Sequence, residues 1–365
     1  MALPISAAEI DVWIGTSSHP SSQGIYHCRL NLENGKLSNS QLAAEIKGPG
    51  FLAMHPKLPM LYAVGDLQGT PVVAAYRIDR QDGKVSLKLD SSLPIGDGGA
   101  AHVSVEPSLG RTLLTAQYGG GSTGVFKLDE HGSLTERTQL LEHTGQSPSG
   151  SDRQSASHAH WSGFAPDSRF AFVPDLGLDQ VVIYRLDAPE AKLEPHGAGQ
   201  LPTGAGPRHM KFHPNGRWIY VLNELDLSVS VFDYAAQEGR MSLKQTIPTV
   251  EKSELAKEQT SSCAEIRVHP NGKFVYAANR GHDTLTVFQV DSDTGELTVV
   301  EREPVRGATP RNFNLAPGAK WLLVGGQDSH TLASFEVQGD TGELTYNRSI
   351  INTPAPICVL FGPED

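Results

Sequence analysis

The side chains best suited to chemistry in this sequence are histidines, arginines and a glutamate at the ends of short apolar runs. A histidine, whose unperturbed pKa is near 6.5, can take a proton from water at neutral pH. Arginine can hold an anion or a developing oxyanion through its N–H donors. Brought together, such groups would suit proton transfer on an anionic small molecule. The candidates before apolar runs are His158, His160, Arg208, His209 and Arg311, and those after such runs are Glu224, Asn279 and Arg280.

One stretch, Gly206 to Glu224 (GPRHMKFHPNGRWIYVLNE), shows how these residues could be positioned. Two apolar runs, around Met210–Phe212 and Trp218–Leu222, flank a turn that contains Asn-Gly, which is a strong signal for a β-hairpin. A hairpin returns the chain to the face that it left. We therefore expect Arg208, before the first strand, to end on the same face as Glu224, after the second.

Similar stretches recur along the chain with a nearly regular spacing. The clearest copies are Ser262–Arg280 and His158–Asp175, and looser ones are Gly50–Gly65, Ala101–Gln117 and Pro310–Gly326. Their turn prolines are 51, 59, 48, 56 and 47 residues apart: Pro56, Pro107, Pro166, Pro214, Pro270 and Pro317. A period near 50 residues predicts propeller blades of four strands each.

The two ends of the sequence predict how the ring of blades closes. Glu9–Gly15 resembles the second strand of a blade, with no first strand before it. Pro356–Pro363 has the pattern of a first strand followed by a proline and fits that gap. With Pro363 the turn prolines number seven. The prediction is thus an all-β, seven-bladed β-propeller of four-stranded blades, one domain over residues 1–365, closed by the C-terminal strand in the N-terminal blade.

This geometry gathers the candidate residues on one rim of the central channel. The innermost strand of each blade lines the channel, and the loops before it share a face with the loops between the second and third strands. Two longer segments, Gly145–Ser157 and the charged Glu251–Ser262, which could form a helix, precede first strands and should lie over the same rim. The second-strand exits also bring Asp175, Asn223, Gln327, Asp328 and the run Tyr118-Gly119-Gly120-Gly121 to this rim.

Composition and charge narrow the range of partners and the compartment. The 365 residues carry a formal net charge of −11 with no basic cluster, so neither nucleic acid nor an anionic membrane is an expected partner. The first residues lack a signal-peptide pattern, and no run reaches transmembrane length, so we expect a cytoplasmic protein, monomeric or weakly homo-oligomeric. Cys28, Cys263 and Cys358 lie far apart in strand-like runs and are expected to be reduced and buried.

Neither a metal nor another cofactor is expected. His158 and His160, two apart on an expected strand, would point the same way and could offer two metal ligands. No third histidine, cysteine or carboxylate is spaced to complete a zinc set. The glycine run after Tyr118 is not followed by a helix start or Lys-Ser/Thr, so it is not a phosphate-binding loop. We expect it to allow close approach of backbone to a ligand or to a neighbouring blade.

Five motifs in order resemble the lactonase family of seven-bladed propellers, over nearly the whole chain: the YGGGS segment, His-Ala-His before FAPDSRFAFVPDLGLD, GPRHMKFHPNGRWIYVLNEL, YAANRGHDTLTVF and PRNFNLAPGAKWLLVGGQDS. The family includes bacterial 6-phosphogluconolactonases and fungal carboxy-muconate lactonizing enzymes. The resemblance implies an active site of His160, Arg208, Glu224 and Arg280, and we expect His158, His209, Arg311 and Asn279 to bind substrate. Gln117 and Ser168 depart from the pattern, where the family usually has Asn and Gly.

The implied activity is metal-independent hydrolysis of a sugar lactone, with 6-phospho-D-glucono-1,5-lactone as the first expectation. The product would be 6-phosphogluconate, in the pentose phosphate pathway of carbohydrate metabolism. Two alternatives stay open, a muconate-type cycloisomerase and a non-catalytic binding propeller. The sequence leaves undecided whether His160 or Glu224 is the base, and which arginine would bind a phosphate and which an oxyanion.

Overall fold

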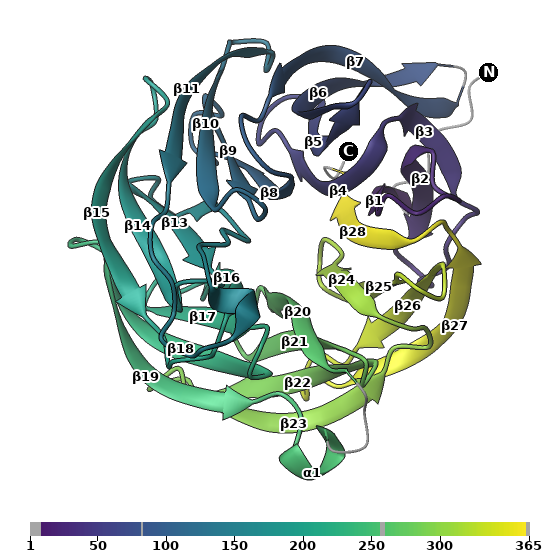
Figure 1. Ribbon diagram of the computed structural model, residues 1–365. Helices are drawn as coiled ribbons and strands as arrows, with labels where there is room; N and C mark the ends of the chain where they lie inside the picture. The colour runs from purple at the N-terminus through teal and green to yellow at the C-terminus, as the bar shows by residue number, and fades with distance from the viewer. Residues whose placement is uncertain (1–8, 82, 256–259, 363–365) are drawn as a thin grey trace.

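The computed structural model describes residues 9–81, 83–255 and 260–362, which form seven four-stranded antiparallel sheets arranged around a central channel (Figure 1). Each sheet is one blade, and its first strand lies innermost. The predicted all-β propeller with four-stranded blades is therefore confirmed. Pro363, the last of the predicted turn prolines, lies outside the described residues.

The blades follow one another in chain order, each running from the channel to the outside. The closing blade is β28 (Pro356–Phe361), β1 (Glu9–Thr16), β2 (Gly24–Asn31) and β3 (Gln41–Glu45). The next are β4 (Lys47–Met54), β5 (Met60–Leu67), β6 (Thr70–Gln81) and β7 (Lys84–Pro94), then β8 (Ala100–Val105), β9 (Thr112–Gln117), β10 (Ser122–Leu128) and β11 (Leu134–Glu142). The fourth is β12 (Gly163–Phe164), β13 (Phe170–Asp175), β14 (Gln180–Asp187) and β15 (Lys192–Gln200). The fifth is β16 (Pro207–Phe212), β17 (Trp218–Asn223), β18 (Ser228–Ala235) and β19 (Arg240–Pro248). The last two are β20 (Ser262–Val268), β21 (Phe274–Arg280), β22 (Thr284–Val290) and β23 (Leu297–Pro304), and β24 (Pro310–Leu315), β25 (Trp321–Gly326), β26 (Thr331–Val337) and β27 (Leu344–Asn352).

The predicted hairpin is the pair β16–β17, and its turn shows why the sequence bends there. Gly216 has φ 69°, in the left-handed region that glycine adopts at little cost. The Asn215 side chain accepts a hydrogen bond from the backbone N–H of Arg217, at 2.9 Å. The ring of His213 accepts one from the N–H of Asn215 and contacts the Gly272 carbonyl in the next blade's turn, at 2.8 Å. The turn therefore also joins two blades.

The ring closes as the sequence predicts. β28 pairs antiparallel with β1, with Val12 opposite Phe361 and Gly15 opposite Cys358. Figure 1 shows β28, in yellow, beside the purple N-terminal strands. Cys358, Val359 and Phe361 are buried, so the closing strand contributes to the core. The last part of the chain thus supplies the innermost strand of the blade that the first part began.

Apolar side chains of adjoining blades pack against one another to form the core. The middle strands are the most buried; every residue of β17 and of β25, for example, is buried. The outer strands are more exposed; in β19, for example, only Met241 is buried. Tyr62, Tyr220 and Tyr276 each donate a hydrogen bond from the phenol to a glycine carbonyl in the next blade, which satisfies a buried hydroxyl and ties the blades together.

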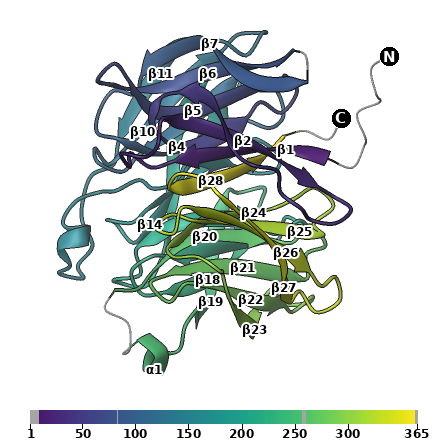
Figure 2. The ribbon, with the colours of Figure 1, turned by 90° about the vertical axis from the view of Figure 1, so that its right-hand side faces the viewer.

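Two loops leave the regular pattern, as expected. Gly145–Ser157 contains a short 3₁₀ helix, η1 (Asp152–Gln154), and projects from one face of the ring (Figure 2). The other predicted segment contains α1 (Lys252–Leu255), and residues 256–259 of it lie outside the described residues. The first loop is held by buried Asp179, which accepts hydrogen bonds from Ser147 (2.5 Å) and Gln154 (2.7 Å). η1 is therefore fixed in place above the channel.

The three cysteines are free and buried, which agrees with the sequence-based expectation. Within the described ranges, no helix is long and apolar enough to cross a membrane.

Candidate active site

A β-bulge at the start of the first strands turns consecutive side chains toward the channel. The pairing of β16 with β17 skips Arg208, and the pairing of β24 with β25 skips Arg311, so each strand carries an extra residue at its entry. Without the bulge, neighbouring residues would point to opposite faces of the strand. The pairs that line the cavity as a result are Gly50 and Phe51, Ala100 and Ala101, Arg208 and His209, and Arg311 and Asn312.

These residues line a cavity of about 590 Å³ at the predicted rim. The second-strand exits add Tyr118, Glu224 and Arg280, the loop with η1 adds Arg153, and His160 comes from the segment before β12. Ile357 of β28 adds the closing blade, so all seven blades and one loop meet around one small volume. This size and concave shape are typical of small-molecule sites.

Glu224 lies at the centre of the charged groups. Its Oε2 accepts a hydrogen bond from Nε of Arg208 at 2.9 Å, and its Oε1 lies 2.9 Å from Nη2 of Arg153 and 3.1 Å from Nη2 of Arg280. Burial alone would favour the neutral carboxyl, but the charges of Arg208 and Arg280 hold the pKa of Glu224 far below 4.5. Glu224 is thus an ionised carboxylate that holds three guanidinium groups in position.

His160 is a buried, neutral imidazole beside this carboxylate. Its Nε2 lies 4.0 Å from Oε2 of Glu224, and its Nδ1 has no hydrogen-bond partner among the described residues. Burial, together with the charge of Arg208 and with His209, lowers the pKa of His160 well below 6.5. The ring also packs edge-on against Tyr118, with ring centroids 5.4 Å apart. A neutral imidazole at the cavity wall can accept a proton.

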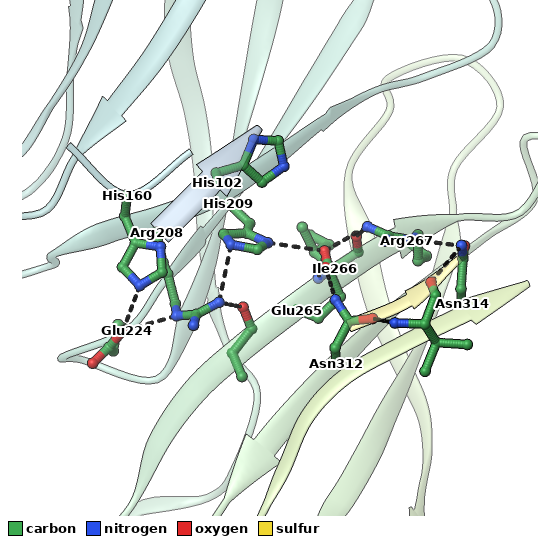
Figure 3. A network of polar contacts seen from close by, with 12 residues as sticks. His102, His160, Arg208, His209, Glu224, Glu265, Ile266, Arg267, Asn312 and Asn314 are labelled. Atoms are coloured by element: carbon green, nitrogen blue, oxygen red, sulfur yellow. Dashed lines mark hydrogen bonds and ion pairs between the residues drawn. The ribbon is translucent and has the colours of Figure 1, made fainter. Parts of the chain in front are cut away.

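His209 is held in a single tautomer by its two neighbours (Figure 3). Nη1 of Arg208 is only a donor and lies 3.0 Å from Nε2 of His209, so Nε2 must be the acceptor. Nδ1 therefore carries the proton and donates to Oε1 of Glu265, at 3.1 Å. Because both ring nitrogens are engaged, His209 positions Arg208 and is not free to act as a base.

Glu265 is a fully buried carboxylate beneath the cavity that sequence reasoning missed. Besides His209 it accepts hydrogen bonds from Arg267 (2.6 Å), Asn312 (2.6 Å) and the backbone N–H of Ile266 (2.9 Å). Oδ1 of Asn312 in turn accepts a hydrogen bond from the backbone N–H of Val359, at 2.8 Å. The network therefore runs from Glu224 through Arg208, His209 and Glu265 to the ring-closing strand β28 (Figure 3).

Positive charge exceeds negative charge in the cavity. The charged side chains that line it within the described residues are four arginines, Arg153, Arg208, Arg280 and Arg311, and one carboxylate, Glu224. With the histidines neutral, four positive charges against one negative charge leave three in excess. The local field therefore favours an anionic ligand although the whole chain has a net charge of −11.

Two residues predicted to bind substrate do not line the cavity. Asn279 is fully buried within its blade, where its side-chain amide donates to the hydroxyls of Thr284 (3.1 Å) and Thr286 (2.9 Å). His158 lies outside the cavity wall, its ring stacked on Tyr118 at 4.6 Å with Nδ1 2.8 Å from the Tyr118 carbonyl. It supports Tyr118 from behind. β12 begins only at Gly163. The prediction that His158 and His160 lie on one strand is therefore wrong.

Other predicted features have structural roles. Asp175 is buried and accepts hydrogen bonds from the backbone N–H groups of His158 (2.7 Å) and Gly177 (3.0 Å), as a turn-forming Asp does. At Gly121 an added Cβ would lie 2.1 Å from Oγ of Ser157, in the segment that leads into the next blade. The glycine run thus permits the close approach to a neighbouring blade that was one of its two predicted roles.

Arg153 is the cavity residue that the repeats could not reveal, because its loop has no counterpart in the other blades. The prediction that Gly145–Ser157 covers the rim was the available signal for it. As for metals, no group of three or more His, Cys, Asp or Glu residues that could hold an ion is found in the part of the chain that the structure describes.

Comparison with known proteins agrees with this geometry. Residues 11–361 match the model of a family described as lactonase, 7-bladed β-propeller. The chain is 35% identical over 349 residues to the 6-phosphogluconolactonase of Bacillus subtilis, which covers 96% of this chain and 97% of the relative. It is 32% identical over 294 residues to a 6-phosphogluconolactonase of Formosa agariphila, covering 78% and 80%. The structure of a periplasmic gluconolactonase from Pseudomonas aeruginosa is similar with a TM-score of 0.89 at 27% identity, over 98% of this chain and 100% of that one.

Proposed function

Because this chain belongs to the lactonase family of seven-bladed β-propellers, we propose that it hydrolyses a sugar lactone, 6-phospho-D-glucono-1,5-lactone before others. The product would be 6-phosphogluconate, which would enter the pentose phosphate pathway. The observation that carries the choice of substrate is the cavity with four arginines, one carboxylate and a neutral histidine. A phosphorylated lactone supplies the missing negative charge, and its ester carbonyl supplies the reacting group.

The proposed reaction needs a base, an oxyanion donor and a route for one proton. His160 takes a proton from water as the water oxygen attacks the lactone carbonyl carbon. The carbonyl oxygen becomes an oxyanion, which collapses as the bond between C1 and the ring oxygen breaks. The protonated imidazole then returns the proton to the departing ring oxygen, which becomes the hydroxyl of the open acid. Water is thus added across one C–O bond, and no metal or cofactor is needed in this scheme.

Arg280 is the proposed oxyanion donor. Its Nη2 is held by Glu224 and by the Cys263 carbonyl, at 2.9 Å from the latter, whereas its Nη1 makes no hydrogen bond with the described residues. A preorganised, unpartnered donor at the cavity is suited to a charge that develops only during the reaction, and such a donor is worth about 10²- to 10³-fold in rate.

His160 is a better base than Glu224 in this arrangement. The lone pairs of Glu224 accept from three guanidinium groups, and its pKa is held far below 4.5, so it has little tendency to take a proton. The carboxylate lies 4.0 Å from Nε2 of His160 and would stabilise the imidazolium once it forms. Glu224 therefore positions the arginines and supports the charge on His160.

The test is lactone opening followed in a pH-stat against the spontaneous rate. Freshly generated 6-phospho-D-glucono-1,5-lactone and D-glucono-1,5-lactone are compared as substrates for the wild-type protein and for His160→Ala. We expect catalysis of both, a higher kcat/KM for the phosphorylated lactone, and loss of catalysis in the variant. Hydrolysis at the spontaneous rate for both lactones would overturn the proposal. The next substrate would then be a muconate-type diacid, whose carboxylates the arginines could also hold, before a binding platform is considered.

A further inference from the structure

The four arginines of the cavity differ in how their donors are engaged. Arg208 donates through Nε to Glu224 and through Nη1 to His209 and to the Ala264 carbonyl. Arg280 donates through Nη2 to Glu224 and to the Cys263 carbonyl. Both are therefore fixed by the protein. Their N–H donors are largely committed to Glu224, His209 and backbone carbonyls.

Arg311 is different. It lies at the bulge that begins β24 and lines the cavity, yet its guanidinium makes no hydrogen bond or ion pair with any residue that the structure describes. Burial, and then the nearby charge of Arg280, lower the pKa of Arg311 to about 10. A bound anion would stabilise this buried guanidinium, which has no ion-pair partner of its own within the described residues. The N–H donors of the Arg311 guanidinium are therefore available to a ligand in the cavity.

Arg153 is the second arginine with a free donor, and its charge is near enough to contribute to the lowered pKa of Arg311. Its Nη2 contacts Oε1 of Glu224 and the Tyr118 hydroxyl, each at 2.9 Å, and its Nε contacts the same hydroxyl at 3.2 Å. Its Nη1 has no partner among the described residues, and its side chain is 49% exposed, so it lies at the mouth of the cavity. Because η1 is anchored through Gln154 to Asp179, the loop that carries Arg153 is held in place before any ligand binds.

We propose that Arg311 and Arg153 form the subsite for a phosphate monoester on the substrate, while Arg208 and Arg280 serve the lactone ring. This inference rests on the proposed function and assigns its substrate class to particular side chains. A phosphate group carries a charge of about −1.5 to −2 at neutral pH and three acceptor oxygens. Two guanidinium groups with free N–H donors match that charge and that geometry. The reacting carbonyl would then face His160, with the phosphate toward the mouth.

The test compares phosphorylated and unphosphorylated ligands on the same variants. Binding of the products, 6-phosphogluconate and gluconate, is measured by calorimetry, and kcat/KM is measured for the two lactones. In Arg311→Ala and Arg153→Ala we expect affinity for 6-phosphogluconate to fall at least about tenfold more than affinity for gluconate, the loss expected for a charge-assisted hydrogen bond. The kcat/KM ratio of the two lactones should change by a similar factor.

Two further variants keep the test decisive. Arg311→Lys retains the charge and should give an intermediate loss, which also guards against misfolding of the alanine variant. Arg240→Ala removes an arginine that is 73% exposed on β19 and should change neither ratio. An equal loss for phosphorylated and unphosphorylated ligands, or no loss, would overturn the subsite.

The subsite and the proposed function can fail separately. If the wild-type protein opens D-glucono-1,5-lactone and shows no preference for the phosphorylated lactone, the subsite is wrong and the lactonase proposal stands. If the protein opens neither lactone yet binds 6-phosphogluconate in an Arg311-dependent manner, the subsite stands and the hydrolase proposal is wrong.

Discussion

Replacing Glu224 by glutamine tests the centre of the site, because it removes one charge with almost no change of shape. In the wild-type protein three guanidinium groups lie 2.9, 2.9 and 3.1 Å from the two carboxylate oxygens. Arg208 and Arg280 are only 3% and 13% exposed, so solvent screens their charges much less than it would at the surface. The variant leaves these cations close together without their counterion.

The expected loss of stability follows from that geometry. Removing one partner of a buried ion pair costs about 3–5 kcal/mol. Unfolding entropy near 2.1 cal/mol/K per residue gives about 0.77 kcal/mol/K for 365 residues, so the Tm should fall by about 4–6 °C. Since the folded-state pKa of Glu224 is lowered, its stabilisation is fully present above the unfolded value and is lost only as the pH falls through the folded one. The difference in Tm should therefore persist at pH 5 and shrink only well below pH 4.5.

The effect on function should separate catalysis from anion binding. We expect kcat for the phosphorylated lactone to fall at least about 10²-fold, because Arg280 loses its fixed position and the imidazolium loses its counterion. Affinity for 6-phosphogluconate should stay the same or rise, because the cavity gains net positive charge. Calorimetry and thermal unfolding measure both, with Glu238→Gln, at an exposed ion pair with Arg240, as the matched control. An unchanged Tm, or a loss of affinity equal to the loss of kcat, would refute this account of Glu224.

Three other outcomes are expected. His160→Ala should lower kcat at least about 10²-fold while largely sparing KM. Because the pKa of His160 is lowered, the kcat/KM of the wild-type protein should stay constant from about pH 8 to 6.5. A decline in kcat/KM that begins above pH 7 would contradict the role of His160 as the base. Truncation after Thr353 removes β28 and should give insoluble protein, because β1 loses its neighbouring strand and Asn312 and Asn314 lose their hydrogen bonds with Val359. A soluble product with the wild-type Tm would disprove this. Prolonged treatment with a chelator should leave lactonase activity unchanged, and loss of a stoichiometric metal together with activity, followed by elemental analysis, would replace His160 by a metal-activated water.

The fold could be predicted from the sequence because each copy of the repeat independently indicates the same local structure. Each copy combines apolar runs of strand length with a turn proline, so agreement among copies outweighs the ambiguity of any one. Ring closure followed from an incomplete blade at one end and a spare strand at the other, and the pairing of Val12 with Phe361 confirms it. Arg208 and Glu224 were placed on one face by the same hairpin logic, and they form an ion pair of 2.9 Å.

The rest of the site could not be predicted, because the repeat does not specify in which direction each side chain points. Asn279 and Arg280 are adjacent at the end of β21, yet Asn279 turns into the blade toward Thr284 and only Arg280 reaches the cavity. The bulges that turn neighbouring residues to the channel leave no mark in the periodicity. Glu265 lies within a strand whose pattern suggests an ordinary core, and its role appears only when β16, β20 and β24 are brought together. Arg153 lies on a loop that belongs to a single blade.

The pairing of β28 with β1 has a consequence for how the protein is made. A ribosome releases β1 long before β28, with about 340 residues between them. At about 5–20 residues per second, the two partners emerge roughly 17–70 s apart. During that time the inner edge of β1, which includes buried Val12, Trp13 and Ile14, has no strand beside it in the nascent chain. The later blades can pack one on another as they appear, but the first blade must wait until β28 has emerged, when Asn312 and Asn314 also acquire their contacts with Val359. The emergence of β28 thus also completes the support beneath the cavity.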